Sequence, residues 1–298
     1  MIAPLRQGSR IAVVSPASAA NGELIDKGMR ALQQWGYEPV LMPHAKARGP
    51  LYYAGSLGDR LQDLHAAFSS DEYDAVLCTR GGWGSAELLP HLDLDLIRAN
   101  PKAFIGYSDH TALQAYLWSA LKLPTIYGPM CAADWALEQG ADAPTWRAAV
   151  ERSSTWQVGE ADGMRVLREG HAEGRLLGGC LAILEAGLGT PYALHLDEPT
   201  ILFLEDINVK PYQWDRMLLH LRYAGLLKNV RGIVFGDMGA NVEPDELPLL
   251  EGALLHALSE FEGPIAIGLR SGHVRGGNRS VPLGEFVALE NNRLRSLS

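Results

Sequence analysis

FIGYSDHTAL, residues 104–113, joins an apolar run to a helical run through a short polar turn. The phenylalanine and isoleucine are typical of a buried strand, and the residues after the histidine carry apolar side chains at helical spacing. Ser108 and Asp109 therefore occur where a strand passes into a helix. Two interpretations are open. Either side chain could cap the helix, or Ser108 is a nucleophile displayed on a tight turn.

The residues around this segment alternate between strand and helix patterns. Strand patterns lie within residues 10–18, 39–43, 73–85, 103–109 and 124–130, and helix patterns within 24–37, 57–68 (with Ser56 as N-cap) and 111–122. Continuous apolar strands that alternate with helices predict a parallel sheet covered on both faces. Ligands of such sheets bind beyond the carboxyl ends of the strands. The turn at Ser108 lies at one of these ends.

The second half of the chain has a different pattern of polar and apolar residues. Residues 136–170 are polar and rich in turn formers, which predicts a connection. Beyond it we expect helices at 174–191 and 212–227 and strands at 200–208, 230–237, 264–273 and 285–290. We therefore predict an α/β protein of two domains, residues 1–160 and 161–298.

Composition narrows the classes of function. The 298 residues are 47% hydrophobic, which supports a large core, and the net charge of -9 argues against nucleic acid or an anionic membrane as the main partner. The N-terminus lacks the pattern of a secretory signal, and no apolar run has the length of a membrane span. Three cysteines without C-x-x-C spacing favour a reduced, cytoplasmic protein. No metal-ligand spacing occurs, and we expect neither a metal nor a cofactor.

A nucleophilic serine needs a histidine as base. His110 is nearest, but side chains two positions apart on a helix do not face each other. His273 lies in the glycine-rich stretch GLRSGHVRGGN after a predicted strand, where it is either functional or an ordinary surface histidine. His110 also replaces the second glycine of the G-x-S-x-G signature of α/β-hydrolases, so that signature is incomplete.

An acid would orient the base. Glu205 and Asp206 end the apolar stretch ILFLED, where an unpaired carboxylate is costly. Either acid could instead cap the next turn or pair with Arg216. The pattern alone does not choose between them.

The glycine-rich loop RGGWG, residues 80–84, follows another predicted strand. Adjacent glycines let backbone N–H groups approach an anion closely. The loop could supply an oxyanion donor, a carboxylate site or a phosphate site, or it could be a simple turn. It matches no nucleotide-binding signature.

Taken together and in order, five segments resemble the LD-carboxypeptidase family of serine peptidases, which includes murein tetrapeptide carboxypeptidases and microcin C immunity proteins. They are RGGWG, FIGYSDHTAL, GGCLAIL, LFLEDINVKPYQWDR and GLRSGH, and they cover nearly the whole chain. The resemblance implies a flavodoxin-like N-terminal domain and a β-rich C-terminal domain, with the active site in the cleft between them. It also implies a homodimer.

The resemblance further implies roles for individual residues. Ser108 would be the nucleophile, His273 the general base, and Glu205, rather than Asp206, its orienting partner. Backbone N–H groups of Asp109 and of Gly82 or its neighbour Gly81 would hold the oxyanion. The implied reaction cleaves the amide between an L-centre and a terminal D-residue, such as D-Ala in L-Ala-D-Glu-meso-diaminopimelate-D-Ala.

Substrate recognition leaves more than one expectation. A carboxypeptidase must hold a free carboxylate, for which we nominate Arg80 or Arg275. Trp83 could instead stack on a base, as an immunity-type hydrolase of aminoacyl-nucleotide amides would require. A non-catalytic binder of cell-wall fragments would need a broken triad, whereas all three residues are present here.

The chain also departs from the family pattern. Cys180 stands where the family usually has asparagine, so an amide that could shape the substrate pocket is absent. Val209 and Lys210 occupy positions where many relatives carry a further acid.

Overall fold

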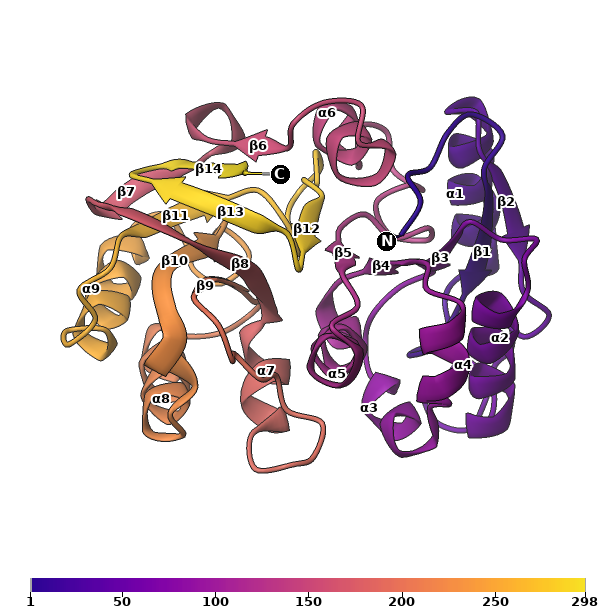
Figure 1. Cartoon of the computed structure of the whole chain (residues 1–298), viewed down its shortest axis with the longest axis horizontal. Coiled ribbons are helices and arrows are strands. Elements are labelled where there is room, and N and C mark those ends of the chain that lie inside the picture. The colour runs from indigo at the N-terminus through magenta and orange to yellow at the C-terminus, as the bar shows by residue number, and fades with distance from the viewer. Residues whose placement is uncertain (1, 298) are drawn as a thin grey trace.

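The computed structural model describes residues 2–297 as two lobes, each built around one sheet (Figure 1). The first sheet has the strand order β12-β5-β4-β3-β1-β2. Its strands are β1 (Arg10–Val14), β2 (Glu38–Leu41), β3 (Ala75–Cys78), β4 (Ala103–Gly106), β5 (Thr125–Tyr127) and β12 (Val281–Leu283). The five N-terminal strands are parallel and follow the flavodoxin order. The predicted class, α/β with a parallel sheet, is confirmed.

Helices cover this sheet. They are α1 (Gly22–Gln34), α2 (Leu57–Ser69), α3 (Ser85–Leu88), α4 (Leu94–Ala99), α5 (Thr111–Leu121) and α6 (Ala143–Trp146). Ser56 caps α2 as expected, in a reciprocal capping box with Asp59. No helix within residues 2–297 combines the length and apolarity that crossing a bilayer requires.

The second sheet has the order β6-β14-β13-β8-β9-β10-β11-β7, with a parallel centre. Its strands are β6 (Gln157–Val158), β7 (Arg165–Arg168), β8 (His171–Cys180), β9 (Thr200–Glu205), β10 (Val230–Gly236), β11 (Ile265–Leu269), β13 (Phe286–Glu290) and β14 (Arg293–Ser296). The helices α7 (Leu181–Gly187), α8 (Pro211–Tyr223) and α9 (Leu247–Ala257) pack on it (Figure 1).

Two expectations for the second half were wrong. Residues 174–180 form the end of β8, and the helix α7 begins only at Leu181. Gly178 and Gly179 have φ angles of 136° and 139°, which a helix excludes. An added Cβ at Gly178 would lie 1.8 Å from the carbonyl oxygen of Phe203, so this glycine lets β8 lie close to β9. The stretch 136–170 also contains β6 and β7.

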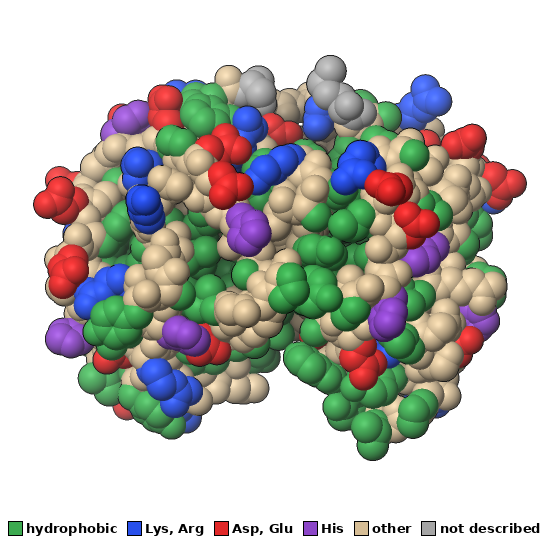
Figure 2. All heavy atoms as spheres, turned by 60° about the horizontal axis from the view of Figure 1, so that its bottom comes forward, with side chains coloured by type: hydrophobic (Ala, Val, Ile, Leu, Met, Phe, Trp, Pro, Cys, Tyr) green, Lys and Arg blue, Asp and Glu red, His purple; other side chains and the backbone are tan. Residues whose placement is uncertain are grey.

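The two lobes share structure across residue 160. β12 pairs antiparallel with β5 in the first sheet, although it lies near the end of the chain. β6 pairs with β14 in the second sheet. One cluster of buried apolar side chains contains residues of both sheets, such as Phe104 and Phe203. The molecular surface is nevertheless notched between the lobes (Figure 2).

Candidate active site

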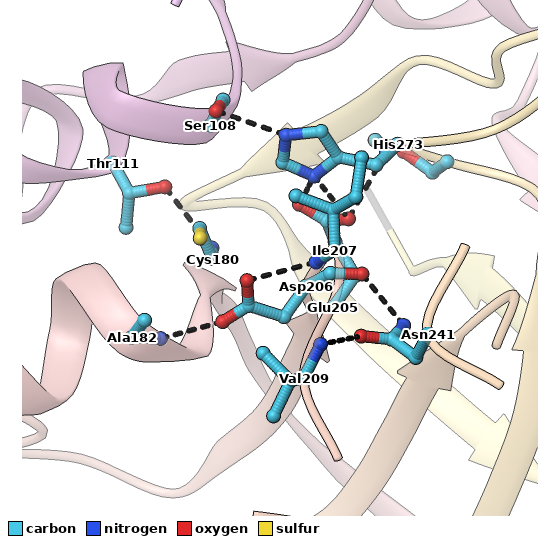
Figure 3. Close-up of polar contacts among 12 residues, drawn as sticks. Ser108, Thr111, Cys180, Ala182, Glu205, Asp206, Ile207, Val209, Asn241 and His273 are labelled. Atoms are coloured by element: carbon cyan, nitrogen blue, oxygen red, sulfur yellow. Dashed lines mark hydrogen bonds and ion pairs between the residues drawn. The ribbon is translucent and has the colours of Figure 1, made fainter. Parts of the chain in front are cut away.

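Three strand ends from distant parts of the sequence meet at the junction of the lobes (Figure 3). Ser108 follows β4, Glu205 ends β9, and His273 lies in the loop after β11. The Ser108 Oγ lies 2.9 Å from the His273 Nε2. On the other side of the ring, the His273 Nδ1 lies 2.9 Å from one Glu205 oxygen and 3.1 Å from the other. The structure therefore joins these three predicted site residues in one hydrogen-bonded chain.

Ser108 has a strained backbone. Its φ of 64° is left-handed, a conformation that costs a residue with a Cβ about 1–2 kcal/mol. The turn directs the hydroxyl toward His273 (Figure 3). Neither Ser108 nor Asp109 makes a side-chain cap to α5, so the capping interpretation of this segment was wrong. The Asp109 carboxylate instead accepts from the backbone N–H of Ser85, 2.8 Å away.

Glu205 fixes the orientation of His273. Its side chain is 2% exposed, and one oxygen also accepts from the backbone N–H of His273 at 3.0 Å. Because a carboxylate only accepts, the His273 Nδ1 carries the proton and the Nε2 lone pair faces the Ser108 hydroxyl. Burial lowers the pKa of His273, but the charge and hydrogen bond of Glu205, with the charges of Asp206 and Asp134, outweigh burial and raise it above 6.5.

Two glycines make room for the acid. Gly272 has a φ of 89°, and a Cβ added there would lie 2.3 Å from the Glu205 Cδ. A Cβ added at Gly236, which ends β10, would lie 2.5 Å from the Glu205 Cβ. The loop of His273 can therefore approach the carboxylate only because position 272 has no side chain.

His110 belongs to the interior instead of the reactive chain. Its Nε2 donates to the carbonyl oxygen of Arg80 at 2.9 Å, and its Nδ1 accepts from the Ser85 hydroxyl at 2.9 Å. Burial lowers the pKa of His110 to about 4, only partly opposed by its bond to Arg80. It is thus a neutral histidine that ties the loop after β3 to the turn at Ser108.

Asp206, the second acid of ILFLED, points away from His273 (Figure 3). Its carboxylate accepts from the backbone N–H of Ala182 in the first turn of α7 and from that of Ile207, each at 2.8 Å. Burial raises the pKa of Asp206, opposed by these two bonds. One acid therefore contacts the histidine, and its neighbour holds a helix start and the following turn.

The RGGWG loop lies directly against the serine. A Cβ added at Gly81 would lie 2.9 Å from the Ser108 Oγ. Ser18 fixes the loop, because its hydroxyl accepts from the backbone N–H of Trp83 at 3.0 Å. Within residues 2–297, the backbone N–H groups of Gly81, Gly82 and Asp109 have no acceptor. They are thus free to bind an incoming oxygen.

The remaining predicted residues surround this centre. Trp83 is 41% exposed, and Arg80 is also exposed. Arg275 is exposed too and borders an open groove that Tyr107, Lys210 and His273 also line. Charged and aromatic side chains are therefore available beside the serine for contact with a substrate.

Cys180 occupies the junction between β8 and α7. Its backbone N–H donates to the Thr111 Oγ1 at 3.0 Å, and the residue is 5% exposed. Burial raises the pKa of the thiol well above 9, and the negative charges of Asp206 and Glu205 raise it further. The thiol is thus neutral and packed beside the acids.

Sequence reasoning missed Tyr127, which ends β5. Its hydroxyl accepts from the backbone N–H of Ser108 at 3.2 Å and donates to Glu205. The signal was present in PTIYGPM, because a polar group at the end of a strand beside β4 lies at the same sheet edge as Ser108.

No group of three or more His, Cys, Asp or Glu side chains within residues 2–297 is arranged to hold a metal ion.

Comparison with known families now identifies the class of protein. Residues 11–128 match the LD-carboxypeptidase N-terminal domain, and residues 173–289 match the LD-carboxypeptidase C-terminal domain. This chain belongs to the LD-carboxypeptidase family. It is therefore a peptidase, and the resemblance drawn from its five segments is confirmed.

Curated relatives match over nearly the full length. A Streptomyces coelicolor relative, itself named only provisionally as a carboxypeptidase, is 36% identical over 97% of this chain and 92% of its own. A probable murein peptide carboxypeptidase of Bacillus subtilis is 32% identical over 96% and 90%. The murein tetrapeptide carboxypeptidase of Pseudomonas aeruginosa is 32% identical over 96% and 94%.

Solved structures share the fold. An MccF-like protein from Bacillus anthracis has a TM-score of 0.88 at 25% identity, covering 99% of this chain and 98% of that one. A muramoyltetrapeptide carboxypeptidase from Oxalobacter formigenes has a TM-score of 0.82 at 25% identity, covering 96% and 97%. Both similarities extend over the two lobes.

Proposed function

We propose that this chain is a serine carboxypeptidase that releases the terminal D-alanine of murein tetrapeptide, L-Ala-D-Glu-meso-diaminopimelate-D-Ala, during cell-wall recycling. The observation that carries the proposal is the hydrogen-bonded chain from Ser108 through His273 to Glu205, with the serine on a left-handed turn. Relatives named for murein peptides support the substrate class.

The roles follow from the geometry. The Ser108 Oγ attacks the carbonyl carbon of the L-centre, and its proton passes to the His273 Nε2. The imidazolium, stabilised by Glu205, then gives this proton to the leaving amine as the amide C–N bond breaks. Water next attacks the carbonyl carbon of the acyl-serine and loses a proton to His273. The ester C–O bond then breaks, and His273 returns this proton to the Ser108 Oγ. His273 therefore accepts and then donates each proton that is transferred.

The oxyanion of each tetrahedral intermediate needs donors that are already in place. Among residues 2–297, the N–H groups of Asp109, which follows the nucleophile, and of Gly82 or Gly81 in the neighbouring loop have no acceptor. The absence of a side chain at Gly81, where an added Cβ would lie 2.9 Å from the Ser108 Oγ, leaves space for the substrate carbonyl. We assign the oxyanion hole to these groups.

The carboxylate of the leaving residue requires a cation. Arg80 precedes Gly81 in the loop beside Ser108, and Arg275 lines a groove with His273. A guanidinium can bind a carboxylate through two parallel bonds. Amidating the C-terminus of the substrate should lower kcat/KM by at least about tenfold, since a charge-assisted contact is worth about 1.5–3 kcal/mol. An unchanged kcat/KM would remove both arginines from this role.

The direct test of the function is product analysis with the purified protein. Murein tetrapeptide should yield free D-Ala and the tripeptide, detected by mass spectrometry and by a D-amino acid oxidase assay. The diastereomer with a terminal L-Ala is the control and should remain intact. Cleavage of neither peptide, or equal cleavage of both, would contradict the proposal.

A second candidate is an immunity-type hydrolase of aminoacyl-nucleotide amides. The observation that favours it is the exposed Trp83 on the loop beside the serine, which offers a face on which a purine can stack. An aminoacyl sulfamoyl adenylate assayed beside murein tetrapeptide separates the two. A higher kcat/KM for the adenylate than for murein tetrapeptide would favour the immunity-type hydrolase over the carboxypeptidase. Trp83→Ala should then lower kcat/KM for the adenylate alone.

We also propose that the protein is a cytoplasmic homodimer. The resemblance to the family supports the dimer, and the cysteine usage supports the compartment. Light scattering of the purified protein should give twice the mass of one chain, and cell fractionation should place it with cytoplasmic markers. A monomeric mass at micromolar concentration would contradict the dimer.

A further inference from the structure

We propose that Tyr127 is a positioning residue that holds the nucleophile and the acid through one hydroxyl group. The inference rests on the proposed function of Ser108, Glu205 and His273. Tyr127 ends β5 in the first sheet, whereas Glu205 ends β9 in the second. The phenol therefore connects the two lobes at the point where the reactive chain is assembled.

The hydrogen-bond directions at Tyr127 are fixed by chemistry. The Glu205 carboxylate can only accept, so the phenol donates its proton to it. The phenol oxygen then accepts the backbone N–H of Ser108 at 3.2 Å. Burial raises the pKa of Tyr127 well above 10, and the charge of Glu205 raises it further, so the donor keeps its proton.

The bond to Ser108 acts on the strained turn. The φ of 64° at Ser108 is disfavoured, and such conformations persist only where their surroundings hold them. Within residues 2–297 the Tyr127 oxygen is the one acceptor of this N–H. Without the hydroxyl, the strained residue would keep a part-buried donor unpaired, and its side chain would lose part of its restraint.

The bond to Glu205 acts on the imidazole. Both carboxylate oxygens contact the His273 Nδ1, and one of them also accepts from Tyr127. A phenol donor disperses negative charge that would otherwise attract the imidazolium. Removing the donor should therefore raise the pKa of His273 and leave the carboxylate freer to rotate.

The surrounding packing makes the phenol rigid. Tyr127 is 0% exposed, and its ring packs edge-on against Phe203 at 5.5 Å and lies 5.9 Å from Tyr107. A Cβ added at Gly179 would lie 3.1 Å from the Tyr127 ring. The hydroxyl position is thus set by the core between the lobes.

Tyr127→Phe tests the proposal, with Tyr37→Phe as a matched control. Tyr37 is also buried, donates to a carboxylate (Glu151) and accepts from an N–H (Trp146 Nε1, 2.9 Å), but it lies outside the site. The two substitutions therefore remove the same kind of hydrogen bonds at different places. Thermal unfolding of both variants measures how much each substitution lowers the melting temperature.

Two readouts separate positioning from a merely structural role. In Tyr127→Phe, kcat for murein tetrapeptide should fall about 10- to 100-fold, with KM within about threefold, because the reacting groups are misplaced after binding. The pKa of His273, followed by NMR of its imidazole and assigned with His273→Gln, should rise by about 0.5–1 unit. Tyr37→Phe should change neither.

A kcat within about threefold of wild type, or a His273 pKa that stays or falls, would overturn the proposal. The NMR titration needs no substrate, so failure of the proposed peptidase function leaves this test intact. If Tyr127→Phe does not fold, 3-fluorotyrosine at position 127 replaces it. A stronger phenol donor should then lower the pKa of His273, and an unchanged or raised pKa would overturn the proposal.

Discussion

At the scale of single residues, the site combines backbone strain with a buried carboxylate that is hydrogen-bonded to a histidine. Ser108 is left-handed, and Glu205 is buried beside a histidine. The sequence predicted that Ser108, the two acids and His273 follow strand ends, and it did so correctly. The local pattern could not choose Glu205 over Asp206, because both end the same apolar run. The family resemblance favoured Glu205, and the contacts separate the two acids. Tyr127 escaped notice because its two partners belong to different lobes.

Strain at Ser108 can be measured by comparing two variants. Ser108→Gly and Ser108→Ala both lack the hydroxyl, but only alanine keeps a Cβ in the left-handed conformation. We expect the glycine variant to unfold with a free energy about 1 kcal/mol higher than the alanine variant. Equal stability in urea titrations would show that the turn is not strained.

The raised pKa of His273 gives the activity a definite pH dependence. The base works only when its Nε2 is unprotonated, so kcat/KM should rise with pH through the pKa of His273, with a midpoint above 6.5. Glu205→Gln removes the largest influence that raises this pKa. The midpoint of the kcat/KM profile of Glu205→Gln should therefore lie at lower pH than that of wild type. The kcat of this variant should also fall. A midpoint that stays in place would contradict the assigned pairing.

At the scale of elements, loops after parallel strands position the site, and hydrogen bonds make these loops rigid. The loop of His273 is held by Asn278, which bonds both backbone groups of Gly272 and the carboxylate of Asp134. Periodicity predicted the helices α1, α2, α5 and α8, but it missed α4 and α9. It also failed at GRLLGGC. The positive φ angles of Gly178 and Gly179 go with close contacts to Phe203 and to Thr111, respectively, which no local pattern reveals.

Two glycines of the His273 loop form a matched pair for a test. Gly272 and Gly276 have similar φ angles of 89° and 81°, but an added Cβ would lie 2.3 Å from Glu205 at position 272 and 3.6 Å from Gln139 at position 276. Gly276→Ala should lose about 1 kcal/mol of stability and keep its activity. Gly272→Ala should lose at least about 100-fold in kcat/KM. Equal kinetics in both variants would contradict the contact with Glu205.

At the scale of the whole molecule, we propose two domains divided near residue 160 that do not fold independently. The family matches end at residue 128 and resume at residue 173, which supports the division. Composition and the change in sequence pattern indicated a domain boundary near residue 160. They could not reveal that β12 pairs with β5 in the first sheet. The pairing of β12 with β5 depends on the tertiary fold, and the three residues of β12 are too few to show a strand pattern in the sequence.

Because β12 and the shared apolar cluster connect the lobes, the protein should unfold as one unit. Calorimetry should show a single transition whose calorimetric and van't Hoff enthalpies agree. Residues 1–160 expressed alone would lack β12 beside β5, and we expect them to aggregate or remain unfolded. Two separated transitions, or a stable folded fragment, would contradict this coupling.

The most direct measurement of the central claim is D-Ala release from murein tetrapeptide by wild type and by Ser108→Ala, side by side at equal concentration. Circular dichroism of both proteins checks that the fold is kept. We predict rapid release by wild type and a loss of about 10³-fold or more in the variant, because the remaining groups only bind the substrate and polarise its carbonyl. Release by Ser108→Ala within about tenfold of wild type would place the nucleophile elsewhere.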